Sequence, residues 1–255
     1  MPITPLIFAH EFRDKFLNPE PLERRLARIL ALGRKYDAKF TFFITTGHLR
    51  PRHEKLVRRI VDEGHELGSH SHDHLNFGII SYDAAKSQIS RSVDILSRYY
   101  PVSGFRAPYL RSNEAVAQAC QNLGLVYQSS DPGVGPMKKG DFWEIPVTRP
   151  MDYEVIQIEH RIRFSEISDR WCSFPDNGEV LLFHPWRIGA RRYIGVLERM
   201  LGSRLKYKTI EQYIGDHSSC SITFDLDFLE TRQVFLHTIR HLVRSPHIRM
   251  NRFHG

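Results

Sequence analysis

Two histidines four residues apart are the first candidates for chemistry in this sequence. His70 and His74 belong to the run His-Ser-His-Asp-His, which directly follows a predicted strand at residues 66–69. If the chain turns helically there, both imidazoles project to one side and can hold a single cation. Two ligands do not make a site, so a third has to come from another part of the chain. Chance also produces this spacing among 14 histidines, as His237 and His241 show.

Arg106 and His184 are the next candidates, because each ends a predicted strand. Arg106 lies in the run Gly-Phe-Arg-Ala-Pro-Tyr, where the proline forces the residue before it into an extended conformation. A guanidinium held by stiff backbone can fix a carboxylate, although a surface salt bridge would use the same residue type. His184, in the run Phe-His-Pro-Trp, is compatible with a catalytic imidazole or with a packed, hydrogen-bonded one.

Strand-like and helix-like segments alternate along the chain and indicate how these candidates meet. Short apolar, β-branched runs predict strands, and apolar residues at helical spacing predict helices between most of them. The predicted strands lie at residues 3–8, 40–45, 66–69, 102–105, 125–130, 142–147 and 180–183. This alternation indicates an α/β protein with a mainly parallel sheet, closed or nearly closed into a barrel. The three candidate segments then share the face where such barrels gather catalytic groups.

One main domain over residues 1–215 is the simplest organisation, because no change in composition marks a linker before that point. The tail, residues 216–255, breaks the pattern and then predicts one strand at 220–224 and a basic helix at 229–243. With 255 residues, 41% of them hydrophobic and 25% charged, the chain has the composition of a globular protein. That composition excludes a disordered, collagen-like or disulfide-stapled chain.

The chain is basic, with a formal net charge of +7. Its arginine groups fall on the polar sides of predicted amphipathic helices, which is typical of solvated faces, so we expect no nucleic-acid partner. The arginines concerned are Arg24, Arg25, Arg28, Arg58, Arg59, Arg191 and Arg192. No apolar stretch approaches the roughly 18–20 residues of a membrane span. The polar residues near the start and three separated cysteines favour a cytoplasmic, reduced location.

Four sequence runs together resemble the polysaccharide deacetylase family, also known as the NodB-homology domain or carbohydrate esterase family 4. The runs are Phe-Thr-Phe-Phe-Ile at residues 40–44, Gly-His-Glu-Leu-Gly-Ser-His-Ser-His-Asp-His at 64–74, Phe-Arg-Ala-Pro-Tyr at 105–109 and Leu-Phe-His-Pro-Trp at 182–186. The likeness extends from about Ala38 to Tyr213 in the family's order. The last two runs resemble most the branch whose first motif reads Asp-Val-Glu or Asp-Val-Asp.

The resemblance implies a distorted (β/α)7-type barrel that hydrolyses N-acetyl groups of amino sugars with a divalent metal ion, expected to be zinc. It makes His70 and His74 metal ligands and Arg106 the residue that orients the base. It also makes His184 the general acid and the backbone amide of Tyr109 an oxyanion donor. The expected substrate contacts are Trp186 and Pro108.

The family's first motif is degenerate at the N-terminal strand of this sequence. The position of the base aspartate holds Ala9, which cannot accept a proton, and the position of the ligating carboxylate holds Glu11. The tail, however, contains Ser-Ile-Thr-Phe-Asp-Leu-Asp-Phe at residues 221–228. This run resembles an intact first motif, with Asp225 as the base and Asp227 as a metal ligand, although both could be ordinary turn residues.

Three explanations of the first motif are open. The tail strand inserts beside the first strand and restores the carboxylates, the site works in altered form through His10 and Glu11, or the protein is a catalytically inactive relative. We favour Glu11 as the third metal ligand, because it follows the first strand in the usual chain order.

The leading hypothesis is a metal-dependent hydrolase that removes an N-acetyl or similar acyl group from an amino sugar or polysaccharide. An allantoinase-like hydrolase of a small non-carbohydrate amide is the first alternative, because Trp186 and Tyr109 suit a sugar ring or a smaller heterocycle. A catalytically inactive carbohydrate-binding protein is the second, motivated by Ala9. The expected partner is therefore an N-acylated sugar or a small amide.

Overall fold

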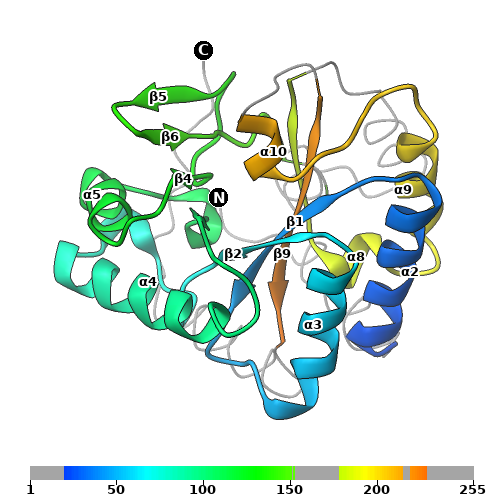
Figure 1. Ribbon diagram of the computed structural model, residues 1–255, viewed down its shortest axis with the longest axis horizontal. Helices are drawn as coiled ribbons and strands as arrows, with labels where there is room; N and C mark the ends of the chain where they lie inside the picture. Colours follow the sequence, from blue (N-terminus) through cyan, green and yellow to red (C-terminus); the bar gives the residue numbers. More distant parts are fainter. Residues whose placement is uncertain (1–19, 151, 153–177, 215–218, 229–255) are drawn as a thin grey trace, which may run out of the picture.

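A computed structural model describes residues 20–150, 152, 178–214 and 219–228 (Figure 1). In these residues, nine strands form one sheet in the order β5-β6-β4-β3-β2-β1-β9-β8-β7. The strands are β1 (Phe40–Thr45), β2 (Glu66–Ser69), β3 (Gly104–Phe105), β4 (Tyr127–Gln128), β5 (Met137–Lys139), β6 (Phe142–Glu144), β7 (Arg149–Pro150), β8 (Val180–Phe183) and β9 (Ser221–Asp227). All neighbours pair in parallel except β5 and β6, which are antiparallel.

Helices connect the parallel strands and cover the sheet. The α-helices are α2 (Leu22–Lys35), α3 (Glu54–Asp62), α4 (Tyr82–Leu96), α5 (Glu114–Asn122), α8 (Pro185–Ile188), α9 (Ile194–Leu201) and α10 (Ile210–Ile214), and the short 3-10 helices are η2 (Pro51–His53), η3 (Phe77–Ile79) and η4 (Pro108–Leu110). Ser81 caps α4, because its hydroxyl accepts the Ala84 N–H. Gly64 and Gly124 follow α3 and α5 with φ of 78° and 74°, a conformation that glycine adopts without steric cost.

The strand that comes last in the described chain lies in the middle of the sheet. β9 pairs with β1 on one side, where Phe43 faces Asp225, and with β8 on the other side, where Phe183 faces Phe224. Figure 1 shows this orange strand running beside the blue β1. The predicted tail strand is confirmed and extends as far as Asp227. A strand buried on both faces needs side chains that are apolar or hydrogen-bonded. Ile222 and Phe224 are apolar, and the Thr223 hydroxyl donates to Leu181 O.

The main hydrophobic core holds β9 in place. The Phe42 and Phe224 rings stack with centroids 4.9 Å apart, and Phe40 meets Phe224 edge-on at 5.4 Å. All three rings are fully buried, and burial of such a side chain contributes about 2–3 kcal/mol. Side chains from α2 and α9 complete this core on the face of β9 that carries Ile222, Phe224 and Leu226.

The predicted α/β class and barrel-type sheet are confirmed. In the described residues the sheet is curled into a half-barrel, and its pairings end at β5 and β7. Strand β5 was not predicted because its side chains are exposed and polar at two of three positions. The predicted strand at 3–8, the helix at 229–243 and the candidates Ala9, His10 and Glu11 lie outside the described residues. The domain boundary near residue 215 stays a prediction.

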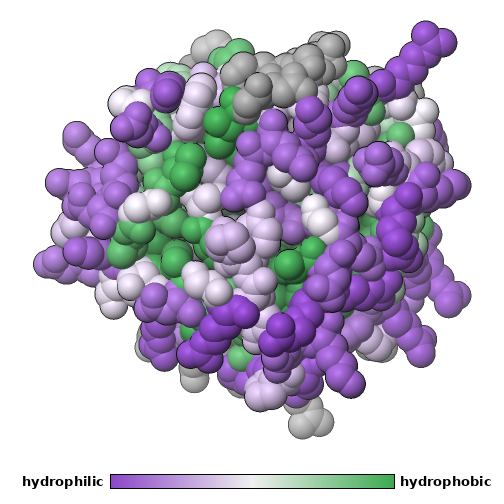
Figure 2. Space-filling model, viewed as in Figure 1, coloured by the Kyte–Doolittle hydropathy of each residue, from purple (hydrophilic) through white to green (hydrophobic). Residues whose placement is uncertain are grey.

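The face of the molecule seen in Figure 2 has the charged, solvated surface that the sequence predicts. Hydrophilic side chains cover the lower right of Figure 2, over α2 and α3. Arg24 and Arg58 are exposed, as the amphipathic pattern predicts, but Arg25 is buried and corrects that prediction. In the described part of the chain, no helix combines the length and the apolar character of a membrane span.

Candidate active site

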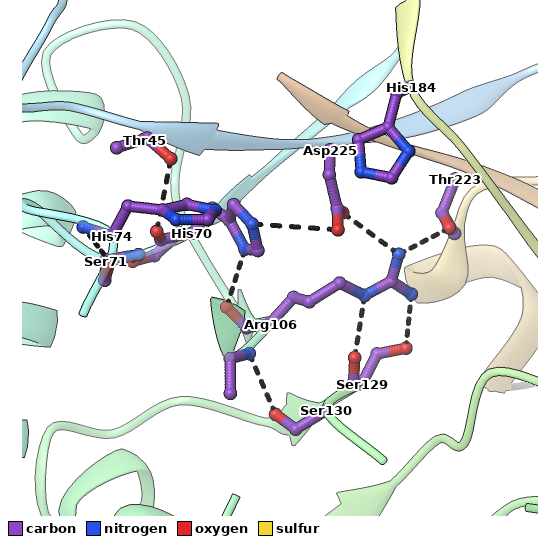
Figure 3. A network of polar contacts seen from close by, with 12 residues as sticks. Thr45, His70, Ser71, His74, Arg106, Ser129, Ser130, His184, Thr223 and Asp225 are labelled. Carbon is purple, nitrogen blue, oxygen red and sulfur yellow. Dashed lines mark hydrogen bonds and ion pairs between the residues drawn. The ribbon is translucent and has the colours of Figure 1, made fainter. Parts of the chain in front are cut away.

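The candidate residues meet at the carboxyl ends of four strands on either side of β1, as Figure 3 shows. His70 follows β2, Arg106 follows β3 and His184 follows β8, while Asp225 lies near the end of β9. This is the end of a parallel sheet where ligands bind in open α/β folds. The sheet therefore brings together groups that the sequence separates widely.

Arg106 is the fixed centre of the site. Its side chain is fully buried, and its guanidinium donates to Ser129 O at 2.7 Å, Ser129 Oγ at 2.6 Å, Thr223 Oγ1 at 2.7 Å and Asp225 Oδ1 at 3.2 Å. The guanidinium carbon also lies 4.3 Å from the centroid of the Phe43 ring. These contacts hold the planar fork in one orientation. Arg106 thus contacts a carboxylate, as the sequence predicts, and the partner is Asp225.

Asp225 lies between two basic groups. Its Oδ2 is 3.6 Å from His70 Nε2, while its Oδ1 accepts from Arg106. Burial raises the pKa of this carboxyl, but its electrostatic interactions with the neighbouring basic side chains, the permanently charged Arg106 among them, lower the pKa by more, so the net pKa is below its ordinary value. The side chain is therefore an ionised acceptor at neutral pH. The tail strand thus brings a carboxylate to these residues, as the first explanation above requires, although it lies beside β1 and the predicted strand at 3–8 is outside the described residues.

The His70 imidazole is oriented by a backbone carbonyl. Its Nδ1 lies 2.9 Å from Arg106 O, and since a carbonyl only accepts, Nδ1 carries the proton. The Nε2 lone pair then faces the side where Asp225 lies. Burial lowers the pKa of His70, which favours the neutral ring. A neutral imidazole with its other nitrogen held by a carbonyl is the usual form of a histidine ligand.

His74 reaches His70 through a strained loop rather than a helical turn. The backbone of Ser71 and His74 is left-handed, with φ of 66° and 54°, and Ser71 Oγ accepts the His74 N–H at 3.1 Å. The two imidazole centroids lie 4.9 Å apart, and the Tyr109 ring lies 4.9 Å from His74. Tyr109 is itself left-handed, with φ of 64°. Such strained backbone gathers at functional sites.

Asp227 has a partner that the sequence analysis did not consider. Its Oδ1 lies 2.9 Å from Nδ1 of His48, which follows β1. Within the described residues, no three His, Cys, Asp or Glu side chains gather as metal ligands. The types of ligand nevertheless suit a divalent cation. The imidazoles of His70 and His74 lie close to β9, which carries two aspartates, and the tautomer of His70 is fixed by Arg106 O.

His184 is held by a carboxylate that was also missed. Asp152 is fully buried, and its two oxygens accept from His184 Nδ1 at 2.7 Å and from the His184 backbone N–H at 2.6 Å. The bond from Nδ1 to Asp152 fixes the orientation of the ring, and the carboxylate stabilises the protonated imidazole. The available signal was an aspartate two residues after the short strand β7.

The expected substrate contacts differ in exposure. Trp186 is half-exposed, with its ring centroid 6.1 Å from that of His184. Pro108 is buried at the start of η4, whereas 47% of Tyr109 is exposed. Tyr109 is therefore better placed than Pro108 to contact a substrate directly.

Comparison with known proteins relates part of the chain to one family. Residues 18–128 match the family model described as polysaccharide deacetylase. This part of the chain is similar to a polysaccharide deacetylase domain. A segment of 108 residues is 31% identical to the peptidoglycan-N-acetylglucosamine deacetylase of Bacillus cereus. The matched segment covers 41% of this chain and only 39% of that enzyme.

Two solved structures have a fold similar to that of this chain. A family 4 acetyl xylan esterase from Clostridium thermocellum, in complex with a cobalt ion, matches with a TM-score of 0.52 at 17% identity, covering 85% of each chain. A CE4 family pseudoenzyme from Bacillus anthracis matches with a TM-score of 0.53 at 18% identity, covering 78% of this chain and 59% of its own. The family model ends before His184 and Asp225, so for these two residues geometry is the evidence.

Proposed function

We propose that the protein is a divalent-metal-dependent hydrolase that removes an acetyl or similar acyl group from the nitrogen of an amino sugar or polysaccharide. The observation that carries this proposal is the position of Asp225. Its carboxylate is buried, 3.2 Å from Arg106 and 3.6 Å from His70, on the strand next to the one that His184 follows, and its pKa is lowered. That arrangement supplies a base beside a candidate cation site and an acid across from it.

Asp225 acts as the general base in this proposal. Arg106 keeps its carboxylate ionised and aimed, so that it can accept a proton from the attacking water. His70, His74 and Asp227 would hold the metal ion, expected to be zinc. When bound, such an ion lowers the pKa of water and polarises an amide carbonyl.

His184 acts as the general acid. Asp152 fixes its ring through Nδ1 and stabilises the protonated form, so that Nε2 can deliver a proton to the departing amine. The backbone amide of Tyr109 donates to the oxygen that becomes negative during the attack. Loss of such a pre-aimed donor costs roughly 100-fold or more in rate.

Acetate release from N-acetylglucosamine oligomers tests the proposal. We expect Asp225→Asn to lower kcat by at least about 100-fold while the circular dichroism spectrum at low temperature stays that of the folded wild type, because the amide keeps the shape but cannot take a proton. A chelator should abolish the wild-type activity and added zinc should restore it. Unchanged turnover by the variant would contradict the assignment of the base. Small cyclic amides in the same panel test the allantoinase-like alternative.

A non-catalytic carbohydrate-binding protein is the second candidate. The observation that favours it is the contact of Asp227 with His48, together with the lack of three gathered ligands among the residues described. The structural likeness to a family pseudoenzyme is compatible with this candidate. It predicts saccharide binding by calorimetry without acetate release at any zinc concentration.

A further inference from the structure

Arg187 is a buried cation that the proposed chemistry does not use. It lies in α8, three residues after His184, and only 1% of it is exposed. Its Nε, Nη1 and Nη2 atoms have no hydrogen-bond partner within the described part of the chain. The guanidinium carbon stacks on the Trp186 ring, 4.5 Å from its centroid. Stacking orients the guanidinium plane but satisfies none of its N–H groups.

A buried guanidinium needs hydrogen-bond acceptors for its N–H groups. It stays charged at physiological pH and carries five N–H donors, and buried charges in proteins are paired as a rule. A buried charge without a compensating partner is strongly destabilising, far more so than an unpaired charge at the surface. Among the described residues, Arg187 therefore has no negatively charged partner.

The neighbouring residues add positive charge instead of neutralising it. Arg25 and Arg28 of α2 donate to the carbonyl oxygens of Trp186 and Gly189, on either side of Arg187 in the chain. The carboxylate of Glu20 is bound by Arg28, with Arg191 3.9 Å away. Asp152, the carboxylate that follows β7, is engaged by His184.

We propose that Arg187 is the base of an oxyanion site that takes a carboxylate or phosphate group. A planar guanidinium binds both groups through two parallel hydrogen bonds, and the surrounding arginines strengthen the attraction. Trp186, on which Arg187 stacks, is only half-buried and connects this position to the His184 side of the molecule. The oxyanion is either free in solution or carried by an acidic sugar. The second source rests on the proposed function, but the site itself does not.

Inorganic phosphate, with a chelator present throughout, is the probe for this site. We expect phosphate to raise the Tm of the full-length protein in a saturable way, by about 5 °C when its concentration exceeds Kd roughly 100-fold. Sodium chloride at matched ionic strength should not reproduce the rise. Calorimetry should give one phosphate per chain.

Arg187→Met removes the charge at similar volume and should melt at or above the wild-type Tm without phosphate, with no phosphate-dependent rise. Arg187→Lys, which keeps the charge but loses the fork, should bind phosphate at least 10-fold more weakly and provides a second test if the methionine variant does not fold. Arg191→Met is the matched control, because that side chain is 83% exposed in the same region. A phosphate response that chloride reproduces, or that survives in Arg187→Met, would overturn the proposal.

Kinetics identify the source of the oxyanion. If the substrate carries it, Arg187→Met raises KM for N-acetylglucosamine 6-phosphate at least 10-fold and leaves KM for N-acetylglucosamine unchanged. If a free anion occupies the site, both values stay unchanged while the phosphate-dependent Tm rise is still lost. Complete inactivity of the wild type would contradict the proposed function and leave the phosphate-binding result intact as the test of the site.

Discussion

Ser129 is the residue that fixes the charged centre of the site. Its carbonyl and hydroxyl oxygens both accept from Arg106, at 2.7 and 2.6 Å, on the edge of the guanidinium away from Asp225. These two bonds prevent rotation of the fork, so that Nη1 remains within reach of Asp225. Ser129 therefore acts on the base through Arg106 and is a positioning residue.

We expect Ser129→Ala to lower kcat/KM of the proposed deacetylation about 10-fold, the effect of one lost hydrogen bond to a charged group. A looser Arg106 also raises the pKa of Asp225, so the acid limb of the pH–rate profile should move to higher pH. Ser92→Ala, at another fully buried serine, is the control and should leave the profile in place. An unshifted acid limb in Ser129→Ala would contradict the positioning role.

At the scale of single elements, β9 decides whether the site exists. It carries Asp225 and Asp227 and pairs with both β1 and β8. Phe224 anchors it between the rings of Phe42 and Phe183. The strand is thus a part of the main core and not an appendage to it.

Truncation of Phe224 measures how deeply β9 is embedded. We expect Phe224→Ala to lower the free energy of unfolding by about 3–5 kcal/mol, because it leaves a cavity in the main core. Val134→Ala, at a fully exposed position, should change it by less than about 0.5 kcal/mol. The measurement is urea unfolding followed by circular dichroism. A loss below 1 kcal/mol for Phe224→Ala would mean that β9 is not a central strand in solution.

Local patterns were sufficient to predict some elements and not others. Apolar runs predicted β1, β2 and β8 with their observed bounds. The short strands β5 and β7 gave no comparable signal, because two or three residues cannot establish a period. The insertion of β9 beside β1 depends on pairing between distant segments, which residue patterns do not encode.

Site residues could be named where they follow a recognisable strand or belong to a run that resembles a family motif. His70, Arg106 and His184 were found in the first way and Asp225 in the second, and the structure brings Asp225 to the other three. Asp152 and His48 were missed, because a single aspartate or histidine in a loop looks like any polar surface residue. Glu11, favoured in the sequence analysis as the third ligand, lies outside the described residues.

At the scale of the whole molecule, two adjacent buried residues control stability in opposite directions. Burial lowers the pKa of His65 from 6.5 to about 4, and burial followed by the charge of Glu211 raises the pKa of Glu66 from 4.5 to about 7. Neutral His65 stabilises the fold fully above pH 6.5, and this contribution is lost as the pH falls toward 4. Protonated Glu66 stabilises it below pH 4.5, and this contribution is lost as the pH rises toward 7.

Glu66→Gln isolates the second effect, because glutamine is neutral and keeps an oxygen for the Thr41 or Tyr127 hydroxyl. Relative to the wild type, we expect the variant to gain about 3 kcal/mol of unfolding free energy between pH 4.5 and 7. Urea unfolding at half-unit pH steps measures the difference. His65→Gln should also gain unfolding free energy relative to the wild type, but in the other pH direction, as the pH falls from 6.5 to 4. A pH-independent difference for either variant would contradict its assigned pKa shift.

The place of β9 has a further consequence while the chain is being made. Until residues 221–227 leave the ribosome, β1 and β8 each present an open row of backbone N–H and C=O groups, separated by a slot one strand wide. Until then, these unpaired strand edges can pair with a strand of another chain. Asp225 and Asp227 lie on β9, so they reach the site in the same step in which β9 pairs with β1 and β8.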